Sequence, residues 1–158
     1  MRRQFAKSLL DHAIKDKRII LLTGDLGMGM WDEFQHLLPE QFINTGASEQ
    51  TLLDMAVGLS YSGKIPFCYS ITSFLLYRGF ETIRSYINHE KLNVKLIGSG
   101  RDTDYHIDGY SHDSSDAKQI LNILPNIVQY WPEKKESIAS AVADMLAVQK
   151  PCFISLRR

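Results

Sequence analysis

The chain has 158 residues, a length typical of one domain with a single hydrophobic core. Its 18 lysines and arginines balance 18 aspartates and glutamates, so no net charge attracts nucleic acid or an anionic membrane surface. The sequence contains no signal segment and no apolar run of membrane-spanning length. Cys68 and Cys152 lie in apolar runs and are expected to be core residues, which fits a reducing compartment. We therefore expect a cytoplasmic protein.

Apolar periodicity predicts helices that alternate with strands along the whole chain. The expected helices cover residues 5–13, 31–38, 49–62, 72–88, 116–124 and 133–149. The expected strands cover residues 19–22, 42–44, 64–70, 92–97, 127–131 and 152–156. Strands that alternate with helices form a mostly parallel sheet with helices on both faces. The sequence thus predicts an α/β domain with no internal repeat or linker.

A glycine-rich loop, residues 23–30, follows the first expected strand. Its three glycines suggest a phosphate-binding loop, but no Gly-Lys-Ser/Thr or G-x-G-x-x-G pattern leads into a helix. We expect instead a flexible loop that faces a ligand, with Asp25 as its charged member.

An acidic residue, Glu49, stands at the head of the 49–62 helix, just after a short strand and a glycine-containing turn. Ser48 is expected to cap this helix. Ligands bind at the carboxyl ends of the strands in an open α/β sheet, and Glu49 is predicted to point toward that edge. A carboxylate that only complements the helix dipole accounts for the same local pattern.

The expected loop over residues 98–115 is rich in acids, histidines and tyrosines, a composition often found where a loop carries function. His106 and His112 raise the question of zinc. No cysteine is nearby and the spacing matches no helical ligand pair, so we expect no metal site here.

Several segments then combine into a more specific pattern. They are residues 45–50 (TGASEQ), 54–59 (DMAVGL), 63–67 (GKIPF), 73–84, 92–95, 108–113 (DGYSHD) and 124–127. In this order and spacing they resemble the pyrimidine-binding domain of transketolase-like thiamine diphosphate enzymes. The resemblance runs from about residue 24 to the C-terminus and implies a three-layer thiamine diphosphate-binding fold over residues 1–158.

The resemblance also implies roles for individual residues. Glu49 would hydrogen-bond to the pyrimidine ring of thiamine diphosphate, so that the cofactor's own amino group can act as the base. Phe74 and Tyr77 would line the pocket that stacks on this ring, although both could be ordinary core aromatics. Asp25 matches an aspartate near the cofactor.

Substrate contacts follow from the same resemblance. Asp108 and His112 match residues that meet the substrate, and a histidine can transfer a proton near neutral pH. Most transketolases carry another histidine directly after the fourth strand, whereas residues 97–101 contain none. The usual sugar-phosphate substrates are therefore in doubt. Arg101 could hold an anionic group there, or be an exposed loop arginine.

Half of the expected cofactor site is missing from this sequence. In the family, a separate domain with Gly-Asp-Gly and an Asn pair holds the diphosphate and Mg²⁺, and this combination does not occur in these residues. We expect no third, C-terminal domain either. The resemblance implies a split enzyme in which a partner subunit supplies these groups, with a homodimer of this chain inside a heterotetramer. Met28, Met30 and Trp31 are candidate anchors for the partner.

The expected activity is transfer of a two-carbon ketol unit from a ketose donor to an aldehyde acceptor. One alternative is a subunit of a decarboxylating relative, resembling deoxyxylulose phosphate synthase or a 2-oxo acid dehydrogenase beta subunit. Another is a non-catalytic scaffold of the same fold. A plain nucleotide-binding domain ranks last because its phosphate fingerprint is absent.

Overall fold

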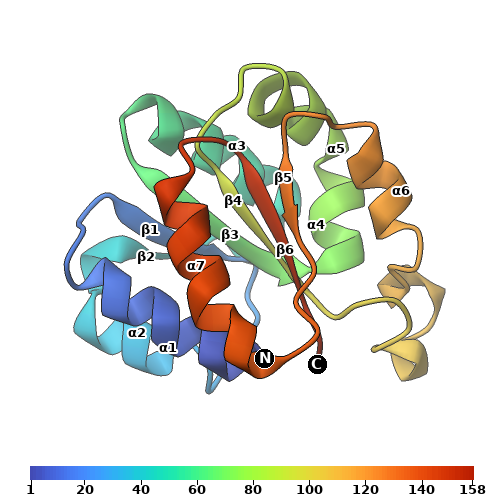
Figure 1. Cartoon of the computed structure of the whole chain (residues 1–158), viewed down its shortest axis with the longest axis horizontal. Helices are drawn as coiled ribbons and strands as arrows, with labels where there is room; N and C mark the ends of the chain where they lie inside the picture. Colours follow the sequence, from blue (N-terminus) through green and yellow to red (C-terminus); the bar gives the residue numbers. More distant parts are fainter.

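The computed structural model describes residues 1–158, in which one six-stranded sheet has the order β2-β1-β3-β4-β6-β5 and every neighbouring pair is parallel (Figure 1). The strands are β1 (Ile19–Thr23), β2 (Phe42–Asn44), β3 (Ile65–Ile71), β4 (Lys95–Ser99), β5 (Val128–Tyr130) and β6 (Cys152–Leu156). The α-helices are α1 (Arg2–Ala13), α2 (Asp32–Leu37), α3 (Glu49–Tyr61), α4 (Thr72–Arg78), α5 (Phe80–Thr82), α6 (Ala117–Asn122) and α7 (Ile138–Ala147). Short helical turns are η1 (Pro39–Gln41), η2 (Ile83–Asn88, of π type), η3 (His106–Asp108), η4 (Tyr110–His112) and η5 (Lys135–Ser137). The prediction of a mostly parallel α/β domain is confirmed.

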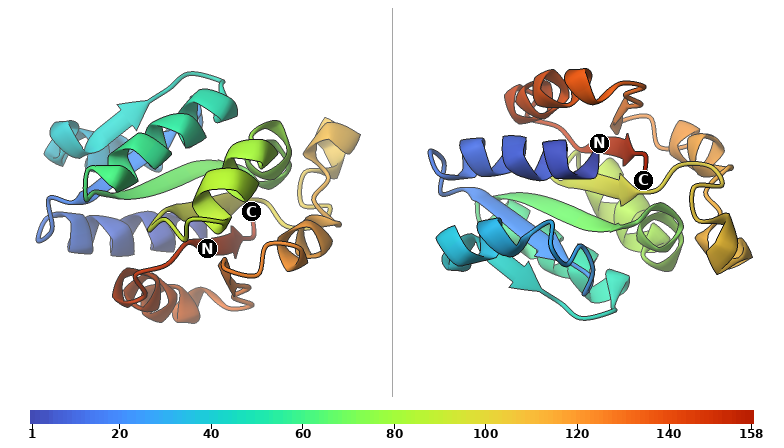
Figure 2. Two further views of the ribbon diagram at one scale, coloured as in Figure 1. Left: turned by 90° about the horizontal axis from the view of Figure 1, so that it is seen from above. Right: turned by 90° about the horizontal axis from the view of Figure 1, so that it is seen from below.

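Each face of the sheet has its own hydrophobic cluster. Helices α1 and α7 cover one face, and α3, α4, η2 and α6 cover the other (Figure 2). Successive side chains of a strand point to opposite faces, so Ile19 and Leu21 join the first cluster while Ile20 and Leu22 join the second. This explains why β1 is apolar at consecutive positions, as expected for a strand covered on both sides.

The strand register creates the edge at which the candidate site lies. Thr23, the last residue of β1, pairs with Asn44 of β2 on one side and with Tyr69 of β3 on the other. The chain order reverses here, because β2 lies outside β1 while β3 lies on its inner side. Such a reversal leaves a crevice beyond the carboxyl ends of the strands, where ligands bind in this fold class.

The expected single helix over residues 72–88 is wrong, because Gly79 separates α4 from α5, and α5 continues directly into η2 at Ile83. Helix α3 passes so close that a Cβ atom at Gly79 would lie 2.2 Å from Leu53 Cδ1 and 3.7 Å from the Glu49 carbonyl oxygen. The glycine thus permits the close approach of α4 and α3, at the cost of helix continuity.

One of the predicted partner anchors is corrected by packing. Trp31 is only 2% exposed and packs edge-on against Phe5, Phe34 and Tyr69, so it is a core residue and not a partner anchor. Met28, in contrast, is 93% exposed.

Strand β4 begins at Lys95, later than the expected residue 92. The Lys95 ammonium is buried and donates to the carbonyl oxygens of Val148 and Lys150, both at 2.8 Å. These bonds tie the start of β4 to the turn before β6. Both cysteines are free and buried, as predicted. None of the helices has the length and apolar character needed to cross a membrane.

The Gly79 contact predicts opposite effects for two glycine substitutions. Gly79→Ala should lower the free energy of unfolding by about 1–3 kcal/mol, because the new methyl group overlaps Leu53. The matched variant Gly58→Ala lies on α3, where a Cβ meets no atom within 4 Å, and should stabilise by about 0.5–1 kcal/mol. Urea unfolding measures both, and an unchanged midpoint for Gly79→Ala would contradict the close approach.

Candidate active site

Glu49 is the first residue of α3, directly after the turn that follows β2. Ser48 occupies the N-cap position, but its hydroxyl bonds to the Thr51 hydroxyl at 2.8 Å and not to a backbone N–H. The expected side-chain cap is therefore wrong. The Ser48 carbonyl oxygen still accepts the first helical hydrogen bond, from Leu52 at 3.0 Å.

The Glu49 carboxyl group is enclosed by three elements and is only 2% exposed. Oε1 accepts a hydrogen bond of 2.8 Å from the Ser70 hydroxyl near the end of β3. Oε2 accepts one of 2.7 Å from Arg78 Nη1 on α4. The backbone of Gly24, after β1, closes the third side, where a Cβ would lie 3.4 Å from Oε1. The predicted position of Glu49 at the carboxyl edge of the sheet is thus observed.

These contacts set the ionisation of the carboxyl group. Burial favours the neutral acid, but the hydrogen bonds from Arg78 and Ser70 outweigh it and hold the pKa of Glu49 below its ordinary value of 4.5. The group is therefore a carboxylate at neutral pH in this structure.

Phe74 provides a flat surface beside this carboxylate. The guanidinium carbon of Arg78 lies 3.8 Å from the centre of the Phe74 ring. The His112 ring packs edge-on against Phe74, with the centroids 4.7 Å apart. We call Glu49, Phe74, Arg78 and His112 the Glu49 cluster.

A hydrogen bond from α4 brings His112 from the distant loop to this cluster. The Ser73 hydroxyl on α4 donates to the Ser111 carbonyl oxygen at 2.7 Å, which anchors η4 beside α4. Within η4, the Ser111 hydroxyl lies 3.1 Å from His112 Nδ1.

Two other predicted residues lie at the rim of this edge or on the exposed loop. Asp25 has a left-handed backbone (φ 58°) and is exposed. Its backbone N–H donates to Asn44 Oδ1, and its carboxylate accepts from Asn44 Nδ2, both at 3.0 Å. Asp108 is exposed in η3. Their predicted roles at the cofactor and substrate stay predictions.

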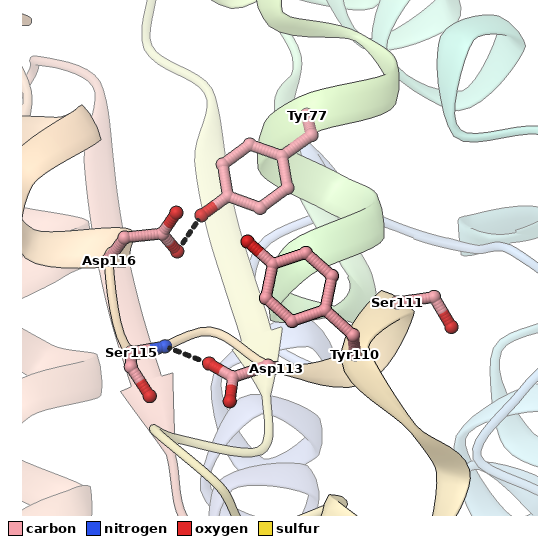
Figure 3. Close-up of a pocket in the computed structure, with 6 residues that line it drawn as sticks. All are labelled: Tyr77, Tyr110, Ser111, Asp113, Ser115 and Asp116. Carbon is pink, nitrogen blue, oxygen red and sulfur yellow. Dashed lines mark hydrogen bonds between the residues drawn. The ribbon is translucent and has the colours of Figure 1, made fainter.

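Tyr77 faces a neighbouring pocket and not the Glu49 cluster. Its hydroxyl donates to the Asp116 carboxylate (Figure 3). The pocket has a volume of about 370 Å³ and is lined by Tyr77, Tyr110, Ser111, Asp113, Ser115 and Asp116. Tyr77 stays a predicted cofactor contact, although its hydroxyl is directed elsewhere here.

Arg101 is not the exposed loop residue that the sequence allowed. It is 3% exposed, and its guanidinium donates to the Ser155 hydroxyl, the Ser155 and Pro132 carbonyl oxygens and Glu133. These hydrogen bonds tie the loop after β4 to β6. A guanidinium so fully occupied is a structural group in this conformation, and its predicted contact with an anionic substrate is not favoured.

The whole chain, residues 1–158, matches the family model described as the transketolase pyrimidine-binding domain. The chain belongs to this family.

Similar proteins include other transketolase-related chains. The chain is 30% identical to "6-deoxy-6-sulfo-D-fructose transketolase subunit SqwH" of Clostridium sp. over 159 residues, 100% of this chain and 49% of that protein. It is 29% identical to "Putative transketolase C-terminal section" of Methanocaldococcus jannaschii, covering 100% of this chain and 50% of that protein. The chain thus spans about half the length of these curated relatives.

Solved structures give the same fold. A structure described as "Split gene transketolase, inactive beta4 tetramer" superimposes with a TM-score of 0.88 and 30% identity, over 99% of this chain and 50% of that one. Transketolase from Leishmania mexicana has a TM-score of 0.83 at 17% identity, over 99% of this chain and 25% of that one, which supports the fold alone.

In this transketolase pyrimidine-binding domain, sequence analysis missed the two partners of Glu49. Arg78 could have been found, because it follows Phe74 by four residues and so shares its helix face. Ser70 has only its place near the end of a strand as a signal. The structure contains no cluster of three or more His, Cys, Asp or Glu side chains that could hold a metal ion.

The lowered pKa of Glu49 predicts a pH-dependent part of the stability. The stabilisation is complete above about pH 4.5 and is lost as the pH falls through the lower folded-state pKa. From about pH 6 to pH 3, the free energy of unfolding of Glu49→Gln should therefore fall less steeply than that of the native chain. Glu40→Gln, at an exposed position, should keep the native slope. Identical slopes for all three chains would contradict the assignment.

Proposed function

We propose that this chain is the pyrimidine-binding half of a thiamine diphosphate-dependent transketolase-type enzyme, with Glu49 as the catalytic carboxylate. The observation that carries this proposal is the buried Glu49 carboxylate at the crevice between β1 and β3, held through one oxygen by Ser70. A carboxylate serving only the helix dipole does not require such burial, since the dipole acts on exposed residues as well.

The Glu49 cluster fits the pyrimidine part of the cofactor. A planar heteroaromatic ring needs an aromatic surface to stack on and a hydrogen-bonding partner in the plane of the ring. Phe74 offers the surface and Glu49 Oε2 the hydrogen-bonding partner. The planar guanidinium of Arg78 already makes both contacts, with its carbon 3.8 Å from the centre of the Phe74 ring and its Nη1 2.7 Å from Oε2. The cluster can therefore accommodate a flat nitrogen-containing group.

When bound, thiamine diphosphate supplies a carbon nucleophile that can carry a two-carbon fragment. The residues of this chain would orient the ring and manage protons. Ser70 fixes Glu49 Oε1, so that Oε2 can hold a proton at one defined position facing the ring. Burial keeps water from competing for that proton. Phe74 sets the tilt of the ring.

His112 and Asp108 would act on the substrate. His112 lies against Phe74 and could donate or accept a proton near neutral pH. Asp108 is an exposed acceptor that could bind substrate hydroxyl groups. Asp25 would lie at the rim of the cofactor site. The transfer we propose moves a ketol unit from a ketose donor to an aldehyde acceptor.

A partner would complete the site. We propose that residues 1–158 form one pyrimidine-binding domain and that a separate subunit holds the diphosphate and Mg²⁺, with two copies of this chain in a heterotetramer. The support is that similar proteins are named as a transketolase "subunit", a transketolase "section" and a "split gene" transketolase. The exposed Met28 and the half-buried Met30 are the predicted anchors that remain available for this contact.

The catalytic role of Glu49 predicts a loss of turnover in the assembled enzyme. Glu49→Gln should lower kcat by at least about 100-fold, because an amide cannot share a proton with the ring as a carboxylic acid does. Glu40→Gln, at the amino end of β2 and so at the opposite edge of the sheet, should retain the native rate. Steady-state assays with ketose phosphates, and with pyruvate to test the decarboxylating alternative, measure both variants. A native rate for Glu49→Gln would refute the assignment.

The half-site predicts that activity depends on a second subunit. The purified chain should bind thiamine diphosphate weakly and turn over no substrate, because it offers contacts to the pyrimidine end alone. Addition of a subunit with Gly-Asp-Gly and the Asn pair should produce both tight binding and activity. Calorimetric titration and a coupled assay test this, and robust turnover by the chain alone would defeat the argument.

A further inference from the structure

Arg78 holds both groups that the proposed function assigns to the pyrimidine ring. Its Nη1 donates to Glu49 Oε2 at 2.7 Å, and its guanidinium lies over the face of Phe74 at 3.8 Å. The other Glu49 oxygen, Oε1, is already bonded to Ser70. Arg78 therefore takes the carboxylate oxygen that Ser70 leaves available.

The shape of the guanidinium matters as much as its charge. It is planar, has N–H donors in its plane and stacks on aromatic faces, which an ammonium group cannot do in the same way. An aminopyrimidine shares the plane, the nitrogen atoms at its edge and the preference for stacking. The same two contacts thus suit both groups, and they cannot be made to both at once.

Few contacts hold the Arg78 guanidinium in the Glu49 cluster. Its side chain is 49% exposed, and its polar contact in the cluster is the one bond to Glu49. The departure of Arg78 would leave the buried Glu49 carboxylate without its cation. The entering ring offsets this cost because it brings a hydrogen-bonding partner to the same oxygen, and the exposed side of Arg78 gives the guanidinium a path into solvent.

We propose that Arg78 is a placeholder for the pyrimidine ring. In the chain without cofactor, its guanidinium occupies the ring's position between Glu49 and Phe74, and the ring enters only when Arg78 swings out. This inference rests on the proposed function. When a binding site is open for only a fraction of the time, its apparent affinity equals the intrinsic affinity multiplied by that fraction.

The test compares the binding of a neutral pyrimidine probe to the purified chain and its variants. The probe is 4-amino-5-hydroxymethyl-2-methylpyrimidine at neutral pH, where the free probe is mainly uncharged and takes up one proton on binding, which lies between its ring nitrogen and Glu49 Oε2. Amide chemical shifts followed by NMR give the dissociation constant. Arg78→Met should bind the probe roughly threefold to tenfold more tightly than the native chain. Arg84→Met, an exposed arginine of η2, should bind as the native chain does.

A second measurement adds free guanidinium ion to the Arg78→Met variant, in place of the missing side chain. Guanidinium chloride at about 0.1 M, below denaturing concentrations and compared with sodium chloride at the same concentration, should weaken probe binding to Arg78→Met and leave the native chain unaffected. An Arg78→Met variant that binds the probe equally or more weakly, or that guanidinium does not affect, would overturn the placeholder role.

A variant of Glu49 distinguishes failure of the placeholder role of Arg78 from failure of the proposed function. Glu49→Ala removes both side-chain oxygens, and loss of probe binding in this variant would support the pyrimidine site even if Arg78→Met behaved like the native chain. Binding that is insensitive to Glu49→Ala, or no binding by any variant, would overturn the proposed function and the placeholder with it.

Discussion

The burial of one carboxylate at the end of the sheet is the constraint on which this edge of the molecule depends. A buried charge is costly unless hydrogen bonds and an opposite charge replace water. Glu49 receives both, from Ser70 and Arg78. Arg78 reaches it because Gly79, the next residue, lets the end of α4 approach the first turn of α3. The break in the helix and the ion pair are thus consequences of the same close packing.

The parts of the fold that the sequence predicted are those that depend on local pattern. Short apolar runs located the strands and period-3.6 apolar repeats located the helices, and the alternation of the two predicted the parallel sheet and the edge where Glu49 lies. The failures involve contacts between distant residues. Gly79 meets Leu53, Trp31 meets Phe5 and Tyr69, and no spacing in the sequence encodes these approaches.

The two arginines near the carboxyl edge illustrate why site residues were harder to predict. Arg101 and Arg78 look alike in sequence, because Arg101 follows β4 and Arg78 ends the helix that follows β3. The structure separates them, because Arg101 is enclosed by Ser155, Pro132 and Glu133 while Arg78 has a single hydrogen bond and is half exposed. Burial and the number of bonds decide which of them can move.

The charges at this edge also bear on why a second subunit would be needed. The one permanent cation of the Glu49 cluster, Arg78, is committed to Glu49, and the adjacent pocket adds the carboxylates of Asp113 and Asp116. Neither place offers free positive charge for a diphosphate group. Phosphate binding relies on backbone N–H groups, cations or a metal ion. A cofactor with a pyrimidine at one end and a diphosphate at the other could be held here by the pyrimidine alone, so the opposite charge must come from outside this cluster.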